Sequence, residues 1–207
     1  IAERVGSSSQ LSIHRDYYQV KANVSIGLGR YHEASNCCAK AISFNDELGR
    51  SSSQQTKAYK LRKLQANIYG HLGQYEDSLR VLSELRGLLM VHGRPQSYEF
   101  LADNYSSAAE TYRAMSKLHD STVFCEKVFR LEQRGLILPH VSAFAHSTMA
   151  LIYGQQGRVN KSLKECWNFL DKTNKLGNEA SCAVYKYPAS CTRSFCGAAK
   201  RLSAARR

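Results

Sequence analysis

The sequence predicts an all-α protein, a right-handed α-solenoid of about four antiparallel helix hairpins. Only 3 prolines and 13 glycines occur among the 207 residues, which fits helices joined by short turns. Small and apolar residues recur at helical spacing along most of the chain. One pattern of small, aromatic and glycine positions also returns in phase. Its turn positions 29, 73, 116 and 157 are separated by 44, 43 and 41 residues.

The second hairpin shows this pattern most clearly. Ala66 and Tyr69 share one face of its first helix, and Gly73 ends that helix. Glycine suits this position because it lacks the Cβ that would clash in a left-handed turn. The second helix then continues at helical spacing with Tyr75, Ser78, Leu82 and Leu85.

The other hairpins carry equivalent residues: Ala22, Gly29, Tyr31, Ala34 and Cys38; Ala109, Tyr112, Ser116, Ser121 and Cys125; Ala150, Tyr153, Gly157, Ser162 and Cys166. Ser116 stands where the others have the turn glycine. We expect hairpins at about 14–46, 55–92, 96–134 and 140–177, within a helical repeat domain spanning 13–177.

The two ends differ from the repeats. Residues 1–12 contain a serine run and are expected to form a flexible lead-in. Residues 178–207 are expected to form a basic cap or tail, since 180–207 hold six Lys or Arg and no acidic residue. The first residue is Ile1, which leaves open that the chain is a piece of a longer protein.

The pattern resembles the tetratricopeptide repeat, a helix hairpin with a usual period of ~34 residues. The longer period here, near 42, is similar to the extended repeats of kinesin light chains and of Pins-type spindle-orientation adaptors. The resemblance covers roughly residues 14–177. It implies an adaptor or scaffold that binds a peptide or helical segment of a partner in a concave groove lined by the first helix of each hairpin.

Sequence motifs for catalysis are missing. The chain has no phosphate-binding glycine loop, no Gly-x-Ser-x-Gly and no His-Glu-x-x-His. Cys182, Cys191 and Cys196 lack the spacing of a zinc site. We therefore expect no enzyme, no catalytic residue, no metal and no cofactor.

The candidate site is the predicted groove. Lys63 and Asn67 lie one helical turn apart, a spacing similar to the carboxylate clamp of chaperone-binding tetratricopeptide proteins. An intact clamp is not expected, because the third hairpin offers Asp103, Ser106, Ser107 and Glu110 at the corresponding positions. The predicted groove residues are Gln19, Asn23, Lys60, Lys63, Asn67, His71, Glu110, Arg113, Ser147 and Leu151.

Charge favours an acidic protein partner. The net charge is +12, and no Asp or Glu occurs between Arg50 and Tyr75. The alternative is a structural component that docks on an acidic assembly such as a microtubule or ciliary axoneme. Nucleic acid is not favoured, because basic and aromatic residues are not interleaved. Exposed apolar ends of a short solenoid favour self-association.

Hydropathy and cysteine content indicate where in the cell the protein is expected. No apolar run approaches the ~20 residues that cross a bilayer. The 7 cysteines are odd in number and irregularly spaced, and three fall at one position of the helix pattern, which indicates reduced, buried thiols. This predicts a reducing compartment, the cytoplasm, with a cytoskeletal or ciliary site as the alternative.

Overall fold

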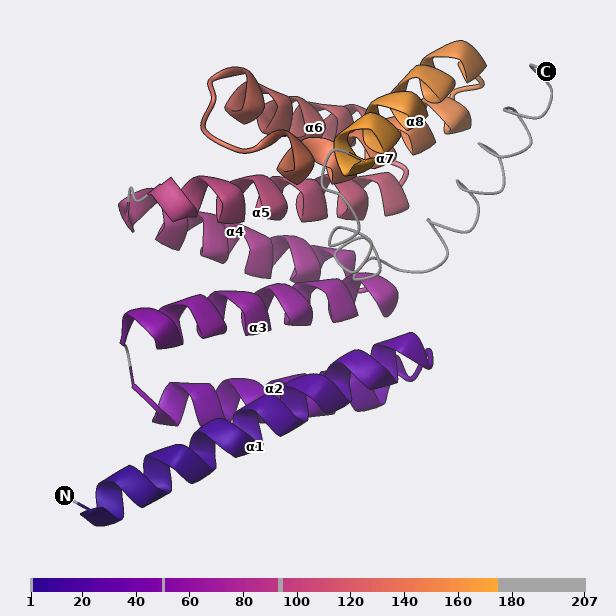
Figure 1. Cartoon of the computed structure of the whole chain (residues 1–207). Helices are drawn as coiled ribbons and strands as arrows, with labels where there is room; N and C mark the ends of the chain where they lie inside the picture. Colours follow the sequence, from indigo (N-terminus) through magenta and orange to yellow (C-terminus); the bar gives the residue numbers. More distant parts are fainter. Residues whose placement is uncertain (1, 50, 93–94, 175–207) are drawn as a thin grey trace. The chain divides into compact units, whose positions relative to one another are not determined.

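The computed structural model describes residues 2–49, 51–92 and 95–174 (Figure 1). Every regular element in these residues is a helix, which confirms the predicted all-α fold class. The chain divides into two compact units, Ile1–Gly93 and Arg94–Arg207. The expected basic tail over 178–207 lies outside the described residues.

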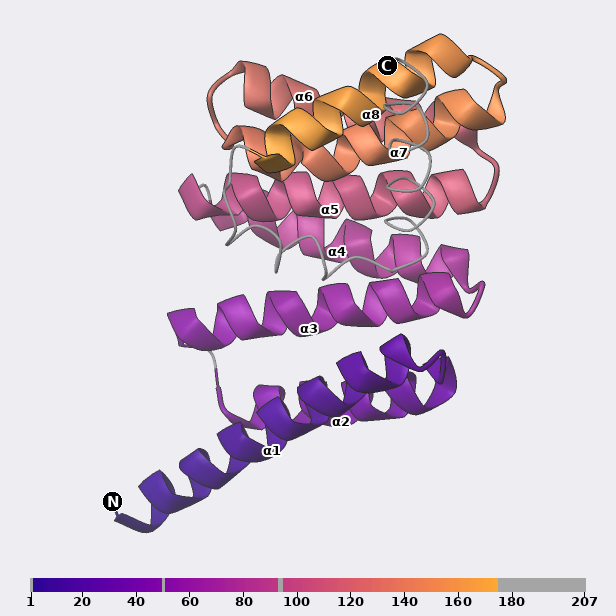
Figure 2. The ribbon, with the colours of Figure 1, turned by 45° about the vertical axis from the view of Figure 1, so that its right-hand side comes forward.

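The first unit contains two helix hairpins whose successive helices pack against one another. α1 begins at Ala2, so the helix includes most of the segment for which the sequence suggests a flexible lead-in. Figure 2 shows the same helices turned by 45°. They are α1 (Ala2–Gly27), α2 (Tyr31–Glu47), α3 (Ser52–His71) and α4 (Tyr75–His92).

The second unit repeats the arrangement, with α5 packing on α6 and α7 on α8. In addition, α5 packs directly against α7. A short 3-10 turn, η1 (Pro139–Ser142), leads into α7. The helices are α5 (Pro95–Ala114), α6 (Leu118–Gln133), α7 (Ala143–Gln155) and α8 (Val159–Asn174).

The turn inside each hairpin has one geometry. The second residue after the first helix has a positive φ, 74° at Gly29, 76° at Gly73, 60° at Ser116 and 70° at Gly157. The next N–H donates back to the carbonyl five residues earlier, as from Gln74 to Tyr69 at 2.9 Å. These bonds satisfy carbonyls that a helix end leaves without partners. Ser116 therefore takes the glycine conformation despite its side chain.

Small residues let the two helices of each hairpin approach closely. Ala22 and Ala34 are fully buried in one cluster. In the third hairpin the Ser121 hydroxyl donates to the Ala109 carbonyl at 2.6 Å. In the fourth, the Ser162 hydroxyl donates to the Ala150 carbonyl at 2.8 Å. The positions that repeat in the sequence are thus the positions at which the helices cross.

Cysteines fill part of the same core. Cys37 and Cys38 of α2 pack with Ile68 of α3, and Cys125 of α6 is buried as well. Burial raises the pKa of Cys38 and of Cys125 to about 12, so both stay neutral thiols. Cys166 is half-buried. Cys38 and Cys125 act as small hydrophobic residues.

The turn geometry predicts opposite effects for a reciprocal pair of substitutions. Gly73→Ser should lower the free energy of unfolding by about 1 kcal/mol, because a side chain is strained at positive φ. Ser116→Gly should raise it by roughly 0.5 kcal/mol, since the greater freedom of glycine in the unfolded chain offsets part of the relief. Urea unfolding followed by circular dichroism measures both changes.

Gly87→Ser is the matched control. Gly87 lies inside α4 with open space where a Cβ would be added, and its φ is not positive. Serine has the better helix propensity there, so this change should be neutral or slightly stabilising. If Gly73→Ser were no more costly than Gly87→Ser, the assigned role of the left-handed turn would be wrong.

Candidate functional site

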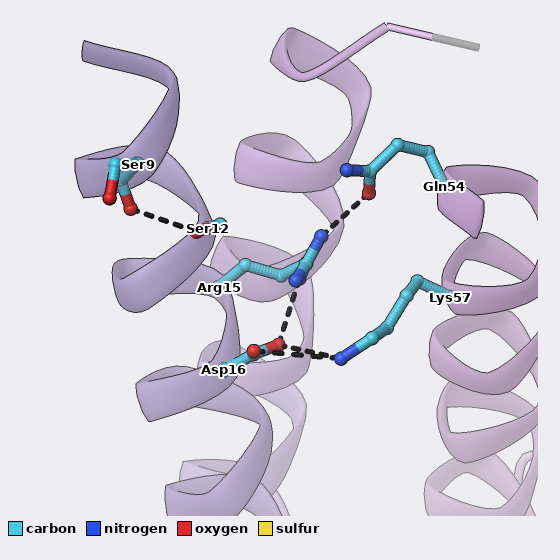
Figure 3. A network of polar contacts seen from close by, with 6 residues as sticks. All are labelled: Ser9, Ser12, Arg15, Asp16, Gln54 and Lys57. Carbon is cyan, nitrogen blue, oxygen red and sulfur yellow. Dashed lines mark hydrogen bonds and ion pairs between the residues drawn. The ribbon is translucent and has the colours of Figure 1, made fainter. Parts of the chain in front are cut away.

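A polar network joins the first helices of the two hairpins in the first unit (Figure 3). Arg15 of α1 donates from Nε to Asp16 Oδ1 at 2.9 Å and from Nη1 to Gln54 Oε1 of α3 at 2.6 Å. Lys57 of α3 donates to both Asp16 oxygens, at 3.2 and 3.5 Å. These contacts hold α1 beside α3 through long side chains.

Arg15 is the centre of this network. It is only 4% exposed, and a buried guanidinium needs hydrogen-bonding partners to offset its lost hydration. The Arg15 hydrogen bond, helped by Lys57, holds the pKa of the Asp16 carboxyl below its usual value, although partial burial acts in the opposite direction. Arg15 and Gln54 are separated by 39 residues, so no local sequence pattern points to their contact.

The predicted groove positions of the first unit follow this network along both helices. We call them the inner face: Asp16, Gln19, Asn23, Lys60, Lys63 and Asn67. Lys60, Asn67 and Asn23 are exposed, and Gln19 and Lys63 are partly buried. Lys60, Lys63 and Asn67 are three and four residues apart, which places them along one side of α3. The inner face therefore carries ammonium and amide groups.

Two further side chains of α3 contact α2. The ring of His71, at the end of α3, stacks on Tyr31 of α2 with centroids 4.7 Å apart. Arg62 faces Asp46 of α2 at 4.0 Å. His71 was predicted as a groove residue, and the structure places it where α3 meets α2. It remains exposed at this contact.

The second unit offers fewer open positions. Glu110 and Arg113 pair with each other within α5, at 2.5 and 2.9 Å. Leu151 is partly buried. Ser147, a predicted groove residue, is 7% exposed, and Ser106, at the equivalent position of α5, is 1% exposed. These two serines are therefore not available to a partner in the described structure.

Side-chain size explains the difference between the units. Small residues such as Ser106 and Ser147 allow helices to approach closely, and α5 does pack against α7. The equivalent positions of the first unit are Gln19 and Lys63. Their longer side chains fit two helices that are linked by polar side chains. An open inner face is thus a property of the first unit alone among the described residues.

Sequence reasoning missed a second polar pair. His146 Nδ1 of α7 lies 2.6 Å from Glu165 Oε2 of α8, and Asn168 also donates to that carboxylate. Burial acts to raise the pKa of Glu165, but the hydrogen bonds from His146 and Asn168 outweigh it and the pKa lies below its usual value. The Phe129 ring lies 4.4 Å from the imidazole. This pair ties α7 to α8 within the unit.

The described residues show neither a metal site nor a membrane span. No group of three or more His, Cys, Asp or Glu side chains there is placed to hold a metal ion. None of the helices described is long and apolar enough to cross a membrane.

The comparisons with known proteins point to one family. Residues 16–47, which cover most of the first hairpin, match the family described as Tetratricopeptide repeat. No curated protein matches the chain.

The Asp16 network predicts a pH-dependent contribution to stability. Because the pKa of Asp16 is lowered on folding, its charge stabilises the fold above the unfolded-state pKa of about 3.9, and this is lost as pH falls through the folded-state value. Asp16→Asn should lower the free energy of unfolding at pH 7 by about 0.5 kcal/mol, a small effect because the carboxyl is half exposed. The difference in the free energy of unfolding between wild type and Asp16→Asn should become smaller below about pH 4.

Urea unfolding of both proteins between pH 7 and pH 3 measures that gap. Glu99→Gln, which removes an exposed carboxyl of α5 in the second unit, controls for the loss of one negative charge. A gap that stays constant or widens toward pH 3 would contradict the role given to Asp16.

Proposed function

Since the chain carries a tetratricopeptide-type helical repeat, we propose that it is a non-catalytic adaptor that binds a segment of a partner protein along the inner face of α1 and α3. The observation that carries this proposal is the polar surface of the first unit, where long side chains join the first helices of two consecutive hairpins. The equivalent helices of the second unit pack together instead.

The chemistry of the inner face favours an acidic segment. Lys60 and Lys63 attract carboxylates, and several cations together steer association even where each rim contact contributes little. The side-chain amides of Asn23 and Asn67 carry both donors and acceptors, as recognition of a peptide backbone requires. Lys57 is paired with Asp16, so its charge helps to hold the scaffold together.

The proposed role needs no covalent chemistry. Cys38 and Cys125 are neutral buried thiols, and Glu165 is held by His146 and Asn168 inside the second unit. Each of these groups has a structural explanation. The proposal therefore rests on a binding surface.

A second candidate function follows from the net charge of +12. A strongly basic chain is attracted to acidic assemblies, and a microtubule or an axoneme presents such a surface. The cytoplasmic, cytoskeletal and ciliary locations expected from the sequence belong to this proposal. Co-sedimentation with microtubules that disappears at high salt would favour it, whereas no co-sedimentation at low salt would exclude it.

The adaptor proposal predicts charge-selective peptide binding. Fluorescein-labelled peptides of acidic, uncharged and basic composition should differ in affinity for the full chain, with the acidic peptides binding most tightly at low salt. Lys63→Glu combined with Asn67→Ala should lower the affinity for the acidic peptides at least about tenfold. Fluorescence anisotropy measures the affinities, and circular dichroism checks that the variant is folded.

Lys164→Glu is the matched control, because it makes the same charge change at an exposed lysine of α8. It should change affinity by less than about threefold, through the long-range field only. If no acidic peptide bound, or if Lys164→Glu weakened binding as much as the inner-face variant, the proposed site would be wrong.

A further inference from the structure

An apolar band runs along α1 on a face that α2 does not cover. Its five members are 56–64% exposed. They follow one another at intervals of four, three, four and four residues, which aligns them along one side of a helix. We call this band the outer stripe: Ile13, Tyr17, Val20, Val24 and Leu28. Of the nine large apolar side chains that are exposed in the described residues, five belong to it.

The repeat shows that this face of a first helix docks another helix. Counted from the turn glycines Gly29 and Gly73, the outer stripe corresponds to positions on α3 that include Leu61 and Ile68. Ile68 packs into the core cluster that contains Cys37 and Cys38 of α2. The carbonyl of Leu61 accepts a hydrogen bond from Cys38 Sγ at 3.5 Å. On α3 the face is covered, and on α1 it is open.

The arrangement of the outer stripe is self-complementary. Ile13 and Leu28 lie equally far from the midpoint between positions 20 and 21, and so do Tyr17 and Val24. Two antiparallel copies of α1 would therefore place Ile13 against Leu28 of the second copy, and Tyr17 against Val24. Val20 of each copy would lie next to the two-fold axis. A surface that matches itself under a two-fold rotation is the requirement for a closed homodimer.

We propose that the outer stripe is a self-association surface, on which α1 of a second copy of this chain packs in antiparallel orientation. The surface has no charged member. Lys21, next to the axis, is already paired with Glu33 of α2 at 3.6 Å, so pairing does not bring together uncompensated like charges. Self-association does not depend on the inner face being a peptide site.

The size of the stripe sets the strength of the contact. Five side chains at this exposure could bury at most about 600 Å² per copy, less than the ~800 Å² per partner of a standard interface. The dimer should therefore be reversible and of micromolar affinity. Asp16, Gln19 and Asn23 are centred roughly 100° around α1 from the outer stripe, because each residue turns the helix by about 100°. The inner face thus stays accessible in the dimer.

Sedimentation velocity of the full chain from about 1 to about 200 μM tests the proposal, since this range spans a micromolar dissociation constant. Wild type should shift from monomer to dimer. Val20→Glu with Val24→Glu should stay monomeric throughout, with the helical circular dichroism signal unchanged. Leu88→Glu is the matched control, because Leu88 is a 61% exposed apolar residue of α4 outside the stripe, and it should dimerise like wild type.

A charge swap tests the antiparallel orientation. Ile13→Glu alone and Leu28→Lys alone should each weaken the dimer at least about tenfold. The double variant should recover dimerisation, because each Glu then faces a Lys of the second copy. In a parallel pair the same double variant would place like charges together and remain monomeric.

Three results would overturn the proposal: wild type that is monomeric at every concentration, a dimer that the stripe variants leave intact, or equal loss of the dimer in Leu88→Glu. The antiparallel pairing would be wrong if the double charge variant dimerised no more tightly than the two single variants.

Discussion

The close crossing of two helices, directly after a left-handed turn, is the constraint on which each hairpin depends. The turn reverses the chain through one residue of positive φ, and the crossing that follows has room only for small side chains. In the third hairpin the Ser121 hydroxyl even reaches the backbone of the facing helix. Overpacking such a crossing would force the helices apart, at a typical cost of about 1–3 kcal/mol.

The helical fold could be predicted because its causes are local. Glycine at the turns and alanine at the crossings are visible as single residues at a fixed spacing, and Ser116 adopts the conformation of the glycine that it replaces. The second hairpin carries the clearest pattern of repeated residues, whereas the family match covers residues 16–47 of the first. The resemblance to kinesin light chains stays a prediction.

The candidate site was harder to predict, because it depends on the distance between helices. Sequence spacing places Ser147 on the same side of its helix as the groove positions, but it cannot tell that α5 and α7 approach closely and bury it. Nor does it show that Arg15 is buried and bonded to Gln54. Long side chains keep the inner face of the first unit open, and small ones close its counterpart. One amphipathic helix, α1, carries both the inner face and the outer stripe on separate sides.

The most direct test of the adaptor account is to map where an acidic peptide touches the chain. Cross-linking mass spectrometry with a carboxylate-to-amine reagent, on the full chain and the acidic peptide that binds it most tightly, gives this information. The account predicts that the peptide is joined mainly to Lys60 and Lys63. Cross-links that fall mainly on lysines of α2 or α8, or that are spread evenly over all exposed lysines, would contradict it.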